Sequence, residues 1–206
     1  QLLHRYNIPM QINCPIMKQN KNDYSGVMLW AQSMNIEADS DYMLFGCYDC
    51  SKKNLKCRLS LSEVEAVVTS QCESGAYVDK LFTEASNKRL DENQPICSVC
   101  SASICISNQG NVYPCEGWQG YSVGSILESS LLDIWRSSER VLMLRKLKLG
   151  DFPQCVSCDY IRYCSPCLYR NANENSGDFH KVSPYFCKVA ELQKRVVEQE
   201  ICKRNN

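Results

Sequence analysis

The sequence predicts a mixed α/β (α+β) fold, in which a part built from repeating βα units is followed by a smaller, cysteine-rich part. Residues 1–45 alternate between helical and strand patterns, which is the rhythm of parallel βα units. Nine of the fifteen cysteines lie within residues 97–187. A polar stretch that ends in proline, residues 91–95, separates the two parts. We therefore expect one domain over residues 1–90 and a second over residues 91–206.

The first 45 residues carry two helix patterns and two strand patterns. Residues 1–6 have the spacing of a helix end, and the alternating residues 8–13 indicate a buried strand. Asp23 is expected to cap a helix over residues 24–34, which has a broad apolar face. Residues 41–45 (DYMLF) are the next strand candidate. Two such units cannot close a barrel, so they resemble the last units of an α/β barrel whose earlier units are absent.

A polar, lysine-rich loop with three cysteines follows the second strand pattern. Its Cys47-x2-Cys50 spacing suits a metal site, and Cys57 lies close behind. Free thiols on a loop are the alternative, and we favour it because the sequence supplies no fourth ligand nearby. The task of these cysteines stays open at this point.

Capping patterns and apolar periodicity predict three further helices. Ser62 and Glu65 have the spacing of a capping box, and Ser130 with Asp133 has the same spacing. Gly75 is expected to divide the first of these helices. The predicted ranges are residues 62–87, 131–148 and 188–203.

A β-hairpin is predicted inside the cysteine-rich part. Residues 104–107 and 111–113 flank an Asn-Gln-Gly turn, with Gly110 at a position that needs a positive φ. Cys115 follows the second strand directly, so the hairpin returns the chain to its own start. Cys105 lies between apolar neighbours on the first strand, and we expect it to be a buried free thiol.

Three CxxC units in this part predict metal binding. Each unit places two thiolates on one short loop, and thiolates are ligands for soft metals. Three units with further cysteines around them predict two iron–sulfur clusters. Residues 171–177 are polar, and we expect them to form a turn-rich connection to Cys187. The three units are Cys97/Cys100, Cys155/Cys158 and Cys164/Cys167.

A disulfide scaffold and structural zinc are the two alternative uses of these cysteines. A disulfide scaffold needs an oxidising compartment, but the cysteine count is odd and residues 1–10 do not form a signal peptide. Structural zinc is the stronger rival, because the four cysteines of residues 155–167 could form one tetrahedral site. Zinc sites often recruit histidine, however, and the only histidines are His4 and His180. This composition favours iron–sulfur chemistry.

Composition excludes several classes of partner. Lys+Arg and Asp+Glu both number 23, so there is no basic excess for binding nucleic acid. No apolar run reaches the length of roughly 20 residues that crosses a bilayer, so we expect no membrane association. Fifteen cysteines without a secretion signal indicate a reducing cytoplasm. The chain begins without Met, and we interpret it as the C-terminal part or a fragment of a longer protein.

The cysteine spacing resembles the signature of the SPASM domain, the C-terminal extension of many radical S-adenosylmethionine (SAM) enzymes. Cys100-x9-Gly110-x4-Cys115 is similar to the first half of that signature. The later cysteines are similar to its second half, except that Cys164-x2-Cys167 is one residue shorter than the family's spacing. Residues 1–65 resemble the final βα units of the radical SAM partial barrel, which is the less specific part of the match.

The resemblance implies two auxiliary [4Fe–4S] clusters whose ligands interleave along the chain. If Cys97 is free, the first cluster would have an open iron for a substrate group. By the same resemblance, Gln11 and Asn13 would lie at the edge of the SAM site. The implied ligands are Cys97, Cys100, Cys115 and Cys167 for the first cluster and Cys155, Cys158, Cys164 and Cys187 for the second.

The resemblance also implies a function. Such enzymes install thioether or carbon–carbon cross-links in a peptide or protein substrate, or oxidise its side chains, with a reductant such as flavodoxin or ferredoxin. The CxxxCxxC triad that anchors SAM is absent, so this chain alone should not cleave SAM. SAM and a third [4Fe–4S] cluster are expected only in a full-length parent. The alternatives are a non-catalytic, cluster-carrying homologue that binds a peptide, and a zinc-stabilised interaction module.

Overall fold

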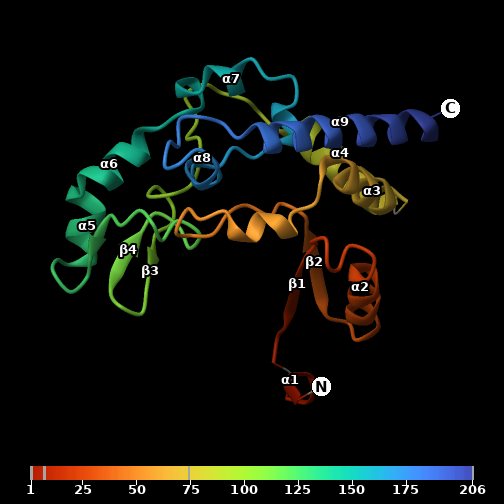
Figure 1. The fold of residues 1–206 in the computed structure, drawn as a ribbon, viewed down its shortest axis with the longest axis horizontal. Coiled ribbons are helices and arrows are strands. Elements are labelled where there is room, and N and C mark those ends of the chain that lie inside the picture. The colour runs from red at the N-terminus through yellow and green to blue at the C-terminus, as the bar shows by residue number, and fades with distance from the viewer. Residues whose placement is uncertain (1, 7, 74, 206) are drawn as a thin grey trace.

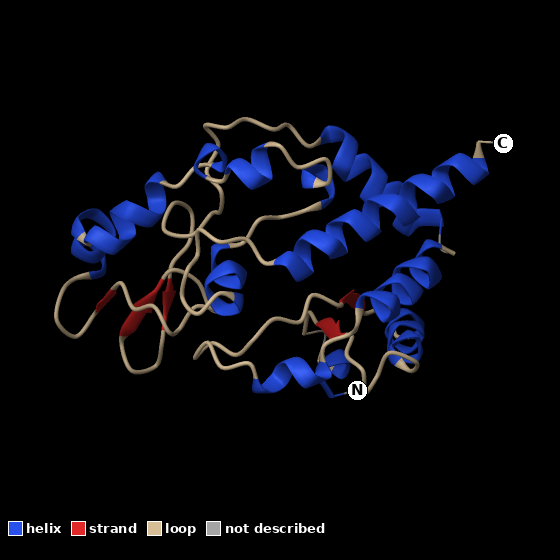
Figure 2. Cartoon of the chain, turned by 45° about the horizontal axis from the view of Figure 1, so that its top comes forward, coloured by secondary structure: helices blue, strands red, loops and turns tan. Residues whose placement is uncertain are grey.

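The computed structural model describes residues 2–6, 8–73 and 75–205, so the predicted helix start at Gln1 lies outside the described residues. Helices predominate, and the strands form two small sheets (Figure 2). The unit made by β1 (Gln11–Pro15), α2 (Tyr24–Ser33) and β2 (Glu37–Asp41) projects away from the rest of the chain (Figure 1). The C-terminal helix α9 (Pro184–Arg204) crosses next to α3 (Leu61–Cys72) and α4 (Gly75–Asn87). No helix in the described part of the chain is long and apolar enough to cross a membrane.

The N-terminal unit contains a parallel pair of strands, as the βα rhythm predicts, but the second strand lies earlier than predicted. The elements are α1 (Leu2–Arg5), β1 (Gln11–Pro15), α2 (Tyr24–Ser33) and β2 (Glu37–Asp41). β1 pairs with β2 in parallel, with Gln11 opposite Glu37 and Pro15 opposite Asp41. Asp23 is the residue before α2, but its side chain makes no capping hydrogen bond.

The prediction of a strand at residues 41–45 was wrong, because β2 ends where that range begins. The polar residues 37–41 pair with β1 along its whole length. The apolar residues that follow pack into the protein interior and do not join the hydrogen-bond ladder of the sheet. Tyr42 is buried, and Phe45 packs against the apolar core of the cysteine-rich part.

Two helices follow a short 3₁₀ helix, and Gly75 opens the second of them, as its predicted dividing role requires. The elements are η1 (Lys53–Cys57), α3 (Leu61–Cys72) and α4 (Gly75–Asn87). The capping box is at Ser60 and Glu63, which corrects the prediction of Ser62 and Glu65. The Glu63 N–H donates to Ser60 Oγ at 3.3 Å, and the Ser60 N–H donates to Glu63 Oε2 at 2.8 Å. Ser60 directly follows the buried Leu59, and this places the helix start two residues earlier.

The predicted hairpin is confirmed and belongs to a three-stranded antiparallel sheet. Its strands are β3 (Cys105–Ile106), β4 (Asn111–Tyr113) and β5 (Gly124–Ser125). Gly110 has φ +82°, as the turn requires. β5 went unpredicted because two small residues carry no alternation signal.

The predicted helix over residues 131–148 is interrupted. It consists of α5 (Leu131–Ser137) and α6 (Glu139–Lys146), with Ser138 extended between them. The Ser138 hydroxyl donates to the Val123 carbonyl at 2.7 Å, which ties the break to the strand segment. Ser130 caps α5 as predicted, because its side chain accepts from the Asp133 N–H.

The remaining elements surround the later cysteines. They are η2 (Leu149–Asp151), α7 (Pro153–Val156), η3 (Ile161–Tyr163), α8 (Leu168–Glu174) and α9 (Pro184–Arg204). The polar residues 171–177 were predicted to be turn-rich, but α8 covers most of them. Asn171 and Asn173 are buried there, and their amides donate to carbonyls of other segments. The polar composition did not predict this helix, because its asparagine side chains are buried and form hydrogen bonds inside the protein.

Two apolar cores hold the chain together. The cysteine-rich core centres on Trp118, Phe152 and Leu168. The N-terminal core includes Ile16 and Leu59 and also buried residues of α9. The C-terminal helix therefore packs on α3 and α4. The division near residue 90 stays a prediction.

Candidate metal centre

All fifteen cysteines lie in the described part of the chain, and all are free thiols. Cys100 and Cys155 are buried, and the other six predicted ligands are half-buried. Cys202 is exposed. Cys105 is half-buried, so the prediction of a buried thiol was wrong. β3 is only two residues long and leaves this side of the sheet partly open.

The first thiol group, which we define as Cys97, Cys100, Cys115 and Cys167, draws on three segments. Cys100 ends its CxxC loop with φ +58°, and its N–H donates to the Ser103 carbonyl at 2.8 Å. Arg145 of α6 donates through Nε to the Cys100 carbonyl at 2.8 Å. The same guanidinium lies 4.7 Å from the Trp135 ring centre, so α6 holds the loop in place.

Cys115 and Cys167 approach this loop from the hairpin and from α8. Cys115 follows β4 after one intervening residue, and the Trp118 N–H donates to the Cys115 carbonyl at 3.1 Å. Hydrogen bonding from the Gly117 and Trp118 backbone lowers the pKa of Cys115. A Cβ on Gly117 would lie 2.7 Å from the Tyr169 ring, so only glycine fits there. Cys167 is the residue before α8.

Electrostatics shows that these thiols are neighbours. Burial raises the pKa of Cys100 to about 11, Arg145 lowers it, and the Cys115 and Cys97 thiols raise it. Burial also raises the pKa of Cys115, to which Cys167 and Cys97 add. These mutual effects connect all four cysteines of the first group.

The second thiol group, which we define as Cys155, Cys158, Cys164 and Cys187, forms around α7, η3 and the start of α9. Burial raises the pKa of Cys155 to about 11, and the other three thiols raise it further. The Cys158 N–H donates to the Cys155 carbonyl at 3.3 Å, which closes that CxxC loop. Cys187 lies in the first turn of α9. The predicted second set is therefore brought together by three separate segments.

Within the described residues, no group of three or more His, Cys, Asp or Glu side chains is arranged to hold one ion. Four sulfurs around one zinc lie only about 3.8 Å apart, given Zn–S bonds of about 2.3 Å. The ligands of a cubane bind four different irons and therefore lie farther apart.

A cavity of about 560 Å³ lies beside the second thiol group. Its wall includes Asp41 from the end of β2, Lys88 from the segment after α4, and Cys164. The Lys88 ammonium donates to the carbonyls of Cys164 and, at 3.1 Å, Ile161. Burial lowers the pKa of Lys88, and the Cys164 thiol raises it. No sequence motif marks Lys88, because the two carbonyls that its ammonium contacts lie 73 and 76 positions later in the chain.

Gln11 and Asn13 lie on the exposed face of β1. Gln11 Nε2 donates to Asp39 Oδ2 of β2 at 3.1 Å. Cys14 points to the opposite face of β1 and packs against the N-terminal core. Gln11 therefore lies next to a carboxylate, and the two thiol groups are formed by other segments of the chain. Their expected place at a SAM site stays a prediction.

Comparisons with known proteins agree with the cysteine pattern. The SPASM family model, an iron–sulfur cluster-binding domain, matches residues 97–167. Native anSMEcpe with bound AdoMet matches 100% of this chain and 59% of its own, with TM-score 0.67 and 15% identity. The same protein with bound AdoMet and Kp18Cys peptide gives TM-score 0.68 at 15% identity, over 60% of its length. No curated protein matches this chain.

The chain spans less than two thirds of the length of these solved structures. At 15% identity the likeness shows a shared fold. The family match rests on the sequence of the cysteine-rich part, and Cys187 lies beyond it. The family model therefore shows a SPASM iron–sulfur cluster-binding domain over residues 97–167. The solved structures show that the chain shares the mixed α/β fold of anSMEcpe.

Proposed function

We propose that this chain is the auxiliary-cluster part of a radical SAM enzyme that modifies a peptide or protein. In this proposal the first thiol group holds one [4Fe–4S] cluster and the second holds another. The modification would be a thioether or carbon–carbon cross-link, or a side-chain oxidation. SAM and the third [4Fe–4S] cluster would belong to the part of the enzyme that carries a CxxxCxxC triad.

One observation carries the proposal. Five thiols of the two groups have raised pKa values, and for each of them the neighbouring thiols that add to the rise belong to its own group; the five are Cys100, Cys115, Cys155, Cys164 and Cys187. The groups interleave in sequence, because Cys167 follows Cys164 but belongs with Cys115. A single CxxC-based zinc loop would instead use neighbouring cysteines.

The chemistry of the donors also fits cubane clusters. Eight thiolates are the ligands that two [4Fe–4S] clusters need. Burial and backbone N–H groups near the sulfurs, such as those of Gly117 and Trp118 at Cys115, are the features that tune cluster potentials. When bound, such clusters supply one-electron transfer. The chain's own part is to bury the thiols and to hold their loops, as Arg145 does for Cys100.

The cavity beside Cys164 supports a peptide as the substrate. It lies where the end of β2 meets the cysteine-rich part, so a chain bound there would contact both. Asp41 and Glu84 supply negative charge in its wall, and Lys88 and Arg162 supply positive charge. Gln11 and Asn13, on the exposed face of β1, are the proposed SAM contacts. A reductant such as flavodoxin or ferredoxin, in a reducing cytoplasm, would deliver the electrons.

The test is the modification of a peptide by the protein that contains this chain. The protein is produced together with candidate substrate peptides, and the mass of each peptide is measured by mass spectrometry. We expect a mass change that is lost in Cys158→Ala and kept in Cys202→Ala, a matched variant at an exposed thiol. A peptide that binds but keeps its mass would favour the non-catalytic homologue. Retained modification in Cys158→Ala would contradict the proposal.

A further inference from the structure

The Cys47–Cys50 loop lies outside both thiol groups and has a closed geometry of its own. The Cys50 N–H donates to the Cys47 carbonyl at 2.9 Å, so residues 47–50 form a β-turn. The Cys47 N–H donates to the Ser51 carbonyl at 2.8 Å and closes the loop a second time. The ends of a β-turn lie within about 7 Å of each other, and the Cα atoms of a disulfide lie about 4.4–6.8 Å apart. The turn therefore brings the two cysteines to disulfide range.

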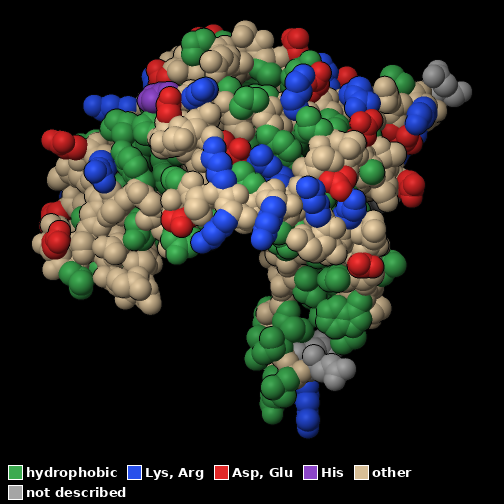
Figure 3. Space-filling view, viewed as in Figure 1, with side chains coloured by type: hydrophobic (Ala, Val, Ile, Leu, Met, Phe, Trp, Pro, Cys, Tyr) green, Lys and Arg blue, Asp and Glu red, His purple; other side chains and the backbone are tan. Residues whose placement is uncertain are grey.

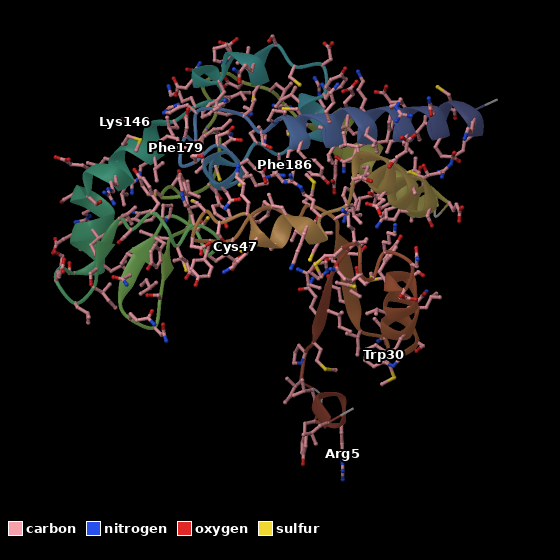
Figure 4. The ribbon with its side chains drawn as sticks, in the orientation of Figure 1. Arg5, Trp30, Cys47, Lys146, Phe179 and Phe186 are labelled. Atoms are coloured by element: carbon pink, nitrogen blue, oxygen red, sulfur yellow. The ribbon has the colours of Figure 1, made fainter. Side chains whose placement is uncertain are left out.

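Hydrogen bonds from neighbouring segments hold the loop in place. The Gly120 N–H donates to the Tyr48 carbonyl at 3.1 Å, and the Tyr169 hydroxyl donates to the Gly46 carbonyl at 3.3 Å. The buried Asn173 donates through Nδ2 to the Cys47 carbonyl at 2.6 Å. Figure 4 places Cys47 where the segment after β2 reaches the loops of the cysteine-rich part. Three contacts from two segments therefore fix the turn in one conformation.

The two cysteines are partly exposed to solvent. Cys47 and Cys50 are half-buried, and the two residues between them, Tyr48 and Asp49, are exposed. Cys50 has φ +60°, a left-handed conformation that a non-glycine residue adopts only when its surroundings impose it. A small molecule could approach this loop without opening the apolar core.

We propose that Cys47 and Cys50 form a redox-active dithiol that undergoes exchange with low-molecular-weight disulfides. One thiolate attacks a sulfur of the external disulfide, forming a mixed disulfide and releasing one small thiolate. The second cysteine then attacks the protein sulfur of the mixed disulfide, which closes the Cys47–Cys50 bond and releases the second small thiol. The protein loses two electrons and two protons, and the external disulfide takes up both. A thiol reductant reverses the exchange.

The site does not depend on the proposed peptide-modifying function. It needs only the turn, the hydrogen bonds that hold the turn in place, and access to solvent. A nearby thiol provides the matched control, because Cys57 is half-buried at the end of η1 and its sulfur accepts a hydrogen bond from Gln19 Nε2 at 3.0 Å. Cys57 has no CxxC partner, so it can form only mixed disulfides.

The test is peptide mapping of the anaerobically purified, cluster-containing protein after equilibration with reduced and oxidised glutathione in graded ratios. Free thiols are trapped with iodoacetamide, and the protein is cut with trypsin. Residues 22–52 form one tryptic peptide, whose only cysteines are Cys47 and Cys50. We expect this peptide to lose two hydrogen masses and both alkyl groups as the glutathione becomes oxidised. In Cys47→Ser, Cys50 should carry glutathione instead, and Cys57→Ser should behave as the unaltered protein does.

Several results would overturn the proposal. Two alkylated thiols at every glutathione ratio would show that the loop does not close. Glutathione bound separately to both cysteines would show that neither attacks the other. Iron content lowered in Cys47→Ser or Cys50→Ser, but not in Cys57→Ser, would make the pair cluster ligands. The mapping of the unaltered protein decides the first two points even if a variant fails to fold.

Discussion

At the residue scale, the eight predicted ligands differ from the other cysteines in their neighbours. Each lies close to thiols of its own group, whereas Cys202 lies exposed near the end of α9. Replacing one ligand should therefore release one cluster and leave the other group intact. The prediction is that Cys158→Ala lowers iron from about eight to about four per chain, while Cys202→Ala keeps about eight. Iron analysis of the two variants, purified side by side, checks it; equal iron in both would contradict the ligand assignment.

Lys88 offers a second prediction at this scale. Its ammonium lies against the Cys164 carbonyl, and a positive charge near a cluster favours the reduced, more negative state. Lys88→Met should make the potential of the second cluster more negative by tens of millivolts. About 1 kcal/mol of charge interaction corresponds to roughly 40 mV for one electron. A redox titration followed by electron paramagnetic resonance measures the shift.

The control for Lys88 is Lys80→Met, at an exposed lysine on α4, the helix that ends just before Lys88. It removes the same charge without a contact to Cys164. Equal shifts in the two variants would mean that net charge, and not position, sets the potential.

The ligands themselves could be predicted from spacing, because cysteines that chelate through CxxC loops leave a pattern in the chain. Lys88 and Asn173 could not be predicted. Each acts on carbonyls 73 or more residues away, and no local pattern records such a contact. Cys105 was misplaced because its apolar neighbours suggested burial, although the short strand leaves it half-buried.

At the element scale, the start of α3 makes a direct test of helix capping. Ser60 and Glu63 satisfy each other's backbone N–H groups, and Lys21 also contacts the Glu63 carboxylate at 2.5 Å. We expect Ser60→Ala to lower the free energy of unfolding by about 1 kcal/mol. Ser62→Ala removes the serine that the sequence pattern favoured and should cost less. Urea unfolding followed by circular dichroism compares them; a larger loss for Ser62→Ala would contradict the observed box.

The pH range of that effect follows from Glu63. The hydrogen bond from Lys21, followed by those from Ser60, lowers the pKa of Glu63 from 4.5 to about 2. A lowered pKa in the folded state stabilises the fold above the unfolded-state value and is lost as pH falls through the folded-state value. The capping box should therefore act at full strength at neutral pH and weaken between about pH 4.5 and pH 2.

Element types were predictable where periodicity was strong, and element ends were not. The hairpin with Gly110 and the long C-terminal helix both formed. The apolar pattern of residues 41–45 predicted a strand, but Tyr42 and Phe45 pack into the apolar cores and these residues do not extend the strand. The break at Ser138 depends on a hydrogen bond to Val123, fifteen residues earlier, which helix periodicity does not record.

At the scale of the whole molecule, α9 connects the second thiol group to the N-terminal core. Its first turn carries Cys187 of the second thiol group, and its buried residues pack in the N-terminal core. The Arg58–Glu174 ion pair, at 2.6 Å, is a second connection between early and late segments. Figure 3 shows apolar side chains on the surface of the unit that contains β1 and α2, which projects from the rest of the molecule. Leu29 and Trp30 of α2 are exposed.

Iron removal should therefore loosen the molecule unevenly. We expect faster hydrogen exchange in α7, α8 and the first turn of α9 after chelation, because metal binding contributes to the folding free energy of these loops. α3, which packs in the N-terminal core without any predicted ligand, should change less. Hydrogen–deuterium exchange with mass spectrometry compares the two forms. Uniform loosening would show that the clusters do not act locally.

The central claim is that eight thiols from distant segments hold two [4Fe–4S] clusters. Its most direct test is the iron, acid-labile sulfide and zinc content of the protein purified without oxygen. The account predicts about eight irons and about eight sulfides per chain. Zinc without sulfide, or about four irons with four sulfides, would contradict it.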